Sequence, residues 1–139
     1  VISELEGMAA RQATRRIRQP QMQQLIESHE RCIVAAESGD HDSFINANKI
    51  FHETIIVSSR NRILIEQIRS VGTLTAVYRR YITHQSGRML TSVREHQSIL
   101  DAIGQHVSLL GEGLSDLLRD LADDDVSEKK MQPNYTPFF

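Results

Sequence analysis

The chain has 139 residues, 40% of them hydrophobic and 24% charged, which suffices for one globular core and is too few for two. Its 16 basic and 18 acidic residues give a net charge of −2, so the chain as a whole is not attracted to nucleic acid or to an anionic membrane. The single cysteine, Cys32, excludes an internal disulfide and a cysteine-based zinc cluster. No apolar run approaches the roughly 20 residues of a membrane span, and no signal-peptide pattern is present, so we expect a cytoplasmic protein without a membrane partner.

Apolar residues recur at helical spacing along most of the chain, and no stretch alternates with a period of two. Six amphipathic stripes are predicted, spanning residues 2–13, 22–36, 44–55, 64–82, 89–103 and 107–121. Pro20 marks the first boundary. Gly39 and Asp40 end the second segment, because glycine suits a left-handed C-terminal position and aspartate can cap the next helix. The fourth stripe is predicted to face inward through Leu74 and Tyr78 and to kink near Gly72. The predicted fold class is therefore all-α.

The helical periodicity stops before the C-terminus. Residues 1–122 are predicted to form one helical domain, and residues 123–139 an irregular or disordered tail. Pro133 and Pro137 prevent a regular helix through the tail. If the tail is ordered, we expect it to dock through the phenylalanines at its end.

Sequence motifs for catalysis are missing. His29-Glu30 and His52-Glu53 each begin like a zinc-protease helix, but isoleucine stands four residues after each histidine, where the second metal ligand would be. No Glu-x-x-His pair, glycine-rich phosphate loop or nucleophile elbow occurs. The chain is therefore not expected to be an enzyme.

Two histidines occupy inward-facing positions on separate predicted helices. His52 follows Asn48 by one helical turn on the same face, and His96 lies in the middle of another apolar stripe. The imidazoles either hydrogen-bond as ordinary core residues, which composition alone favours, or hold a ligand. The other four histidines, at positions 29, 41, 84 and 106, are predicted to lie at the surface or in loops.

Three segments in order, ELEGMAARQAT, NKIFHETIIVSSRNRIL and REHQSILDAI, resemble the FCD ligand-binding domain. This is the C-terminal effector-binding and dimerisation domain of FadR-type regulators in the GntR superfamily, and the resemblance covers residues 2–122. It implies an antiparallel bundle of six to seven helices and a homodimer. It also implies a small organic acid or acyl metabolite as effector, which controls operator binding allosterically. DNA would be contacted only through an N-terminal winged helix-turn-helix, which is absent from this chain.

The resemblance also implies a divalent metal (Zn, Ni or Mn) held by Asn48, His52 and His96. In the family a further histidine completes the site, and its expected position here is held by Leu118. Leucine cannot ligate a metal, so binding should be weaker and the effector less polar than in relatives with all four ligands.

Candidates for orienting an anionic effector are Arg11, Tyr78 and Arg79, because a guanidinium offers a planar fork to a carboxylate. The alternatives are core packing for Tyr78 and a solvated surface position for Arg79. For the whole chain, the alternative is a helical protein-interaction module with structural histidines and no ligand.

Overall fold

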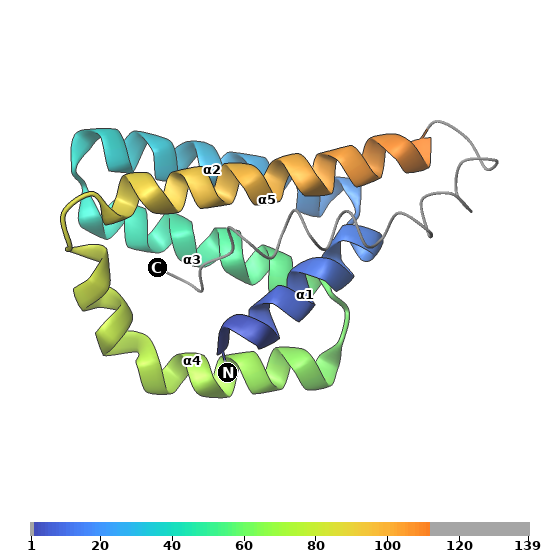
Figure 1. Ribbon diagram of the computed structural model, residues 1–139, viewed down its shortest axis with the longest axis horizontal. Coiled ribbons are helices and arrows are strands. Elements are labelled where there is room, and N and C mark those ends of the chain that lie inside the picture. The colour runs from blue at the N-terminus through green and yellow to red at the C-terminus, as the bar shows by residue number, and fades with distance from the viewer. Residues whose placement is uncertain (1, 112–139) are drawn as a thin grey trace.

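The computed structural model describes residues 2–111, which form five α-helices joined by short turns (Figure 1). The helices are α1 (Ile2–Arg16), α2 (Gln19–Ser38), α3 (His41–Ser58), α4 (Arg62–Thr83) and α5 (Arg88–Gly111). No strand occurs in this part of the chain. The predicted all-α class is confirmed.

The helix boundaries follow from local backbone chemistry. Gly39 closes α2 with φ of 70°, a left-handed conformation that costs glycine little. Asp40 caps α3, since its carboxylate accepts a hydrogen bond from the backbone N–H of Ser43 at 3.1 Å. Asn61 caps α4 in the same way through the N–H of Leu64. Both turns therefore begin the next helix at a defined residue.

The core lies where α2 packs against α3 and α5 and where α1 crosses the other helices (Figure 1). Its largest cluster joins aromatic and aliphatic side chains from α2, α3 and α5 to small alanines of α1. The members are Ala10, Ala13, Leu25, Phe51, Ile55, Ile99, Leu100, Ala102 and Ile103. The alanines let α1 approach closely, because their short side chains leave room for the larger ones opposite.

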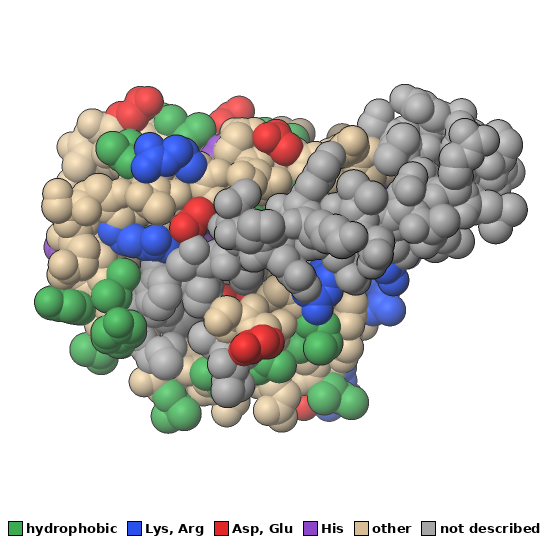
Figure 2. All heavy atoms as spheres, viewed as in Figure 1, with side chains coloured by type: hydrophobic (Ala, Val, Ile, Leu, Met, Phe, Trp, Pro, Cys, Tyr) green, Lys and Arg blue, Asp and Glu red, His purple; other side chains and the backbone are tan. Residues whose placement is uncertain are grey.

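The first half of α4 packs against α1 and α3, whereas its second half turns away from this contact. Leu64 and Ile68 pack with Ala9 and Ile56 in a buried cluster. In its second half the ribbon changes direction, and hydrophobic side chains gather there at the surface (Figures 1 and 2). The prediction that Leu74 and Tyr78 face inward is wrong, since they are 84% and 59% exposed.

The end of the predicted bundle falls only partly within the described residues. Helix α5 continues without a break through Gly111, so the first residues of the sixth predicted stripe belong to α5. The rest of that stripe, with Leu118, and the predicted tail at 123–139 lie outside the described residues. None of the helices in residues 2–111 combines the length and apolar character needed to cross a bilayer.

Candidate functional site

The two inward-facing histidines meet in the core. His52 comes from α3 and His96 from α5, and their Nε2 atoms lie 3.2 Å apart. The two side chains are 1% and 2% exposed. Asn48, one turn before His52, is also buried. The helical spacing thus predicted correctly that these three side chains turn inward, and the fold brings the two imidazoles together.

Aromatic packing fixes the orientation of the pair. Phe51 stacks on His96 with ring centroids 4.1 Å apart, and His52 meets His96 edge-on at 5.1 Å. Burial, assisted by the neighbouring His52, His29 and Arg88, holds the pKa of His96 well below its usual range. His96 is therefore neutral at physiological pH, and only one of the two Nε2 atoms carries the shared proton.

A third histidine joins this region against expectation. His29 on α2 is buried, and its ring lies 5.9 Å from that of His96, so the prediction of a surface position was wrong. Its Nε2 donates to the side-chain oxygen of Gln97 at 2.9 Å, since the Gln97 amide nitrogen is used to donate to Asp101. His106 is also buried. Its position and that of His29 in apolar stripes of their helices were the signal that could have identified them.

The predicted metal ligands, Asn48, His52 and His96, meet some of the requirements of a metal site. Two nitrogens bound to one tetrahedral zinc at ~2.0–2.1 Å lie about 3.3 Å apart, so the 3.2 Å between His52 and His96 suits joint ligation as well as a hydrogen bond. The described residues nevertheless contain no group of three or more His, Cys, Asp or Glu side chains that could hold a metal ion. Asn48 would have to provide the third protein ligand, and the metal site stays a prediction.

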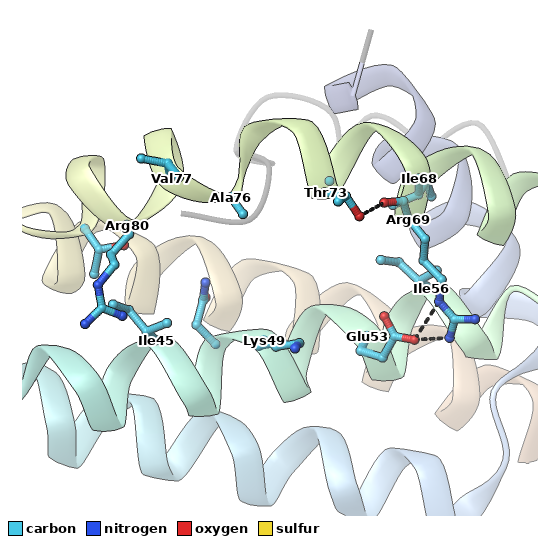
Figure 3. Close-up of a pocket in the computed structure, with 13 residues that line it drawn as sticks. Ile45, Lys49, Glu53, Ile56, Ile68, Arg69, Thr73, Ala76, Val77 and Arg80 are labelled. Carbon is cyan, nitrogen blue, oxygen red and sulfur yellow. Dashed lines mark hydrogen bonds and ion pairs between the residues drawn. The ribbon is translucent and has the colours of Figure 1, made fainter.

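A cavity of about 910 Å³ lies between α3 and α4, next to this core (Figure 3). Its wall is mainly apolar, and Asn48 connects it to the helix that carries His52. The lining residues are Ile45, Asn48, Lys49, Glu53, Ile56, Ile68, Arg69, Gly72, Thr73, Ala76, Val77, Arg80 and Thr83. The volume is in the upper part of the range of ~300–1,000 Å³ that is usual for small-molecule sites.

Two arginines of α4 form ion pairs across the cavity. Arg69 binds Glu53 of α3 at one end, and Arg80 lies at the opposite end (Figure 3). Arg80 binds Asp42 in the first turn of α3 at 2.8 Å. Between them, Lys49 makes no hydrogen bond or ion pair with any described residue. Sequence reasoning missed Lys49, because a lysine at the edge of a helical stripe is usually solvated.

Two of the three residues predicted to orient an effector, Arg11 and Tyr78, do not line the cavity. Arg11 lies back along α1, with Nη1 3.5 Å from where a Cβ on Gly7 would stand. Tyr78 is on α4 but points to the surface and does not line the cavity. Arg79 belongs to α4, and its side chain is outside the described part. The cavity offers Lys49 and Arg80 instead.

Comparison with known proteins gave one finding. The FCD domain family matches residues 1–111, which is most of the chain. No curated protein and no solved structure matched.

Proposed function

The chain belongs to the FCD domain family, which forms the C-terminal domain of GntR-family regulators, and from this we propose that it senses an effector for a DNA-binding regulator of the FadR subfamily. The effector is a small organic acid or acyl metabolite, and its binding changes the affinity for operator DNA. The observation that carries this proposal is the α3–α4 cavity, which begins one helical turn from the buried histidine pair.

The cavity suits reversible ligand binding rather than catalysis. Its wall is mainly apolar, and three of the four charged side chains that line it are cationic, as expected for a site that recognises an organic anion. The histidine pair is packed against Phe51 beside the cavity and does not line it. The pair therefore supports the wall of the site from the core side.

Helix α4 is suited to transmit binding. One face of its second half lines the cavity, and four exposed apolar side chains follow one another along this half: Leu74, Val77, Tyr78 and Tyr81. Val77 belongs to both sets. We call these four residues the α4 stripe. In a homodimer formed through the α4 stripe, any shift of α4 caused by a ligand would change the packing between the two subunits. Such a ligand acts only through its different affinity for the two arrangements, typically ~1–3 kcal/mol of coupling.

A blocked cavity tests the proposal. Ala76→Trp places a large side chain in the cavity, and Ser70→Trp places one at an exposed position of α4 outside it. Acetate, benzoate, adipate and decanoate are screened for an increase in melting temperature. We expect at least one acid to stabilise the unmodified chain and the Ser70→Trp variant but not the Ala76→Trp variant. Stabilisation by none of them, or equally in both variants, would favour the alternative, a helical interaction module with structural histidines.

The predicted metal needs a separate test. When bound, a divalent metal would supply a Lewis-acid contact for an anionic effector. The prediction requires that chelator-treated protein takes up one equivalent of Zn²⁺, and that His52→Ala and His96→Ala each abolish this uptake while the exposed-site variant His84→Ala retains it. Uptake that persists in the core variants would contradict it, as would no uptake at all.

A further inference from the structure

The charges that face the α3–α4 cavity are unbalanced. Three cationic side chains and one carboxylate line it, and with Asp42, the carboxylate that pairs with Arg80, the local net charge is +1 in a chain whose overall charge is −2. Uneven local charge of this kind attracts ions of opposite sign into a cleft with apolar walls. The cavity is therefore electrostatically suited to an anion.

Only one of these cations is available without breaking an ion pair in the described structure. Arg69 is neutralised by Glu53, and Arg80 by Asp42. Lys49 has no such partner, and it stands one turn from Ile45 and one turn from Glu53 on α3. Four residues of an α-helix rise about 6 Å along its axis, so Lys49 lies between the two ion-paired ends rather than at either of them.

The remaining wall favours an apolar body. Ile45, Ile56, Ile68, Ala76 and Val77 line the cavity from both helices. A compact acid would leave most of the 910 Å³ and most of this apolar surface unused, whereas an extended hydrocarbon would cover it. The size of the cavity and its lining therefore favour a ligand with one charged group and a large apolar part.

We infer that the α3–α4 cavity binds amphipathic monoanions, that is, carboxylates with an extended apolar body, and that Lys49 is the residue that binds the carboxylate. This deepens the proposed function and rests on it, because it specifies the effector class of the same cavity. The apolar body lies against the isoleucines, and the amide of Asn48 offers a neutral polar contact at the base of the cavity.

Calorimetric titration with three probes of equal chain length tests the inference. Decanoate carries one charge, decanedioate carries two, and 1-decanol carries none. Decanoate should bind most tightly. Lys49→Met should weaken decanoate binding about tenfold, as expected for loss of a charge-assisted contact, and should leave 1-decanol binding unchanged. Lys49→Arg should retain decanoate binding, and Arg94→Met, which removes an exposed charge on α5 away from the cavity, should have no effect.

The outcomes separate this inference from the proposed function. If decanoate binds equally well to Lys49→Met, or if decanedioate binds more tightly than decanoate, the inference is overturned. In both cases the proposed function survives, provided that binding is lost in Ala76→Trp. Decanoate binding that persists in Ala76→Trp, or no binding of any acid, would overturn both.

Discussion

The histidine pair shows how a buried polar contact can depend on protonation. His52 and His96 share one Nε2-to-Nε2 contact, which requires one ring to donate and the other to accept. Protonation of both rings would place two donors and two positive charges face to face in a dry environment. The fold therefore disfavours the doubly protonated pair and stabilises neutral His96.

This arrangement predicts a stability that falls in acid. The pKa of His96 is lowered in the folded protein and is near 6.5 in the unfolded chain, so below that pH the unfolded chain binds more protons. The free energy of unfolding should thus decrease as the pH falls from about 6.5, by up to ~1.4 kcal/mol per pH unit, and level off below the folded pKa. His96→Gln should remove this slope in urea titrations with chelator present.

The matched control for this pH effect is an exposed histidine. His84→Gln changes an exposed side chain at the end of α4 and should retain the slope of the unmodified protein. A slope that is the same in His96→Gln as in the unmodified chain would show that other groups cause the acid sensitivity.

The helical spacing of apolar residues predicted which side chains point into the core, but it did not predict which residues they contact. Asn48, His52 and His96 could be placed in the core from the sequence, because each lies in an apolar stripe. His29 could have been placed there too. The importance of Lys49 could not be predicted, because it depends on the pairing of Arg69 and Arg80 with carboxylates across two helices. Such pairings arise only from tertiary packing.

At the scale of elements, the prediction succeeded where a helix has neighbours on its apolar face. The turn at Gly39 and Asp40 could be located from local chemistry, since capping depends on residues close in sequence. The second half of α4 has the same kind of apolar spacing as its first half, yet Leu74 is exposed. Spacing identifies a stripe but cannot tell whether the chain itself or another molecule covers it.

Two ion pairs join α4 to α3 at the ends of the cavity, and breaking one of them should change ligand preference. Asp42→Asn removes the partner of Arg80 and leaves a second cation for a ligand. We expect the affinity for decanedioate relative to decanoate to rise several-fold, with the free energy of unfolding reduced by less than ~1 kcal/mol, because the pair is exposed.

Competitive calorimetry with the two acids checks this expectation. Glu66→Gln is the control, since it breaks the exposed pair between Arg62 and Glu66 on α4, away from the cavity. An unchanged ratio in Asp42→Asn would show that Arg80 does not reach a bound ligand.

At the scale of the whole molecule, the α4 stripe holds four of the nine large hydrophobic side chains that are exposed among those that the structure describes. Its four members follow the i, i+3, i+4, i+7 spacing of a buried face, and Val77 is exposed as fully as Leu74. A two-fold dimer would pair the stripe with its own copy, so each apolar contact would occur twice. The same helix forms a wall of the cavity, so dimerisation and ligand binding are expected to be coupled.

The oligomeric state tests this arrangement. Leu74→Glu introduces a charge into the α4 stripe without touching the cavity, and because Leu74 is already exposed, the fold of the single chain should keep its stability. In a two-fold interface the change acts twice, and burying an apolar side chain of this size contributes ~1.5–3 kcal/mol, so dimer dissociation should become at least ~100-fold easier. Sedimentation velocity over a range of concentrations should find the unmodified chain as a dimer and Leu74→Glu as a monomer. Val34→Glu, the same kind of change at an exposed position of α2, should remain a dimer. A monomeric unmodified chain, or dissociation caused equally by both variants, would show that α4 is not the interface.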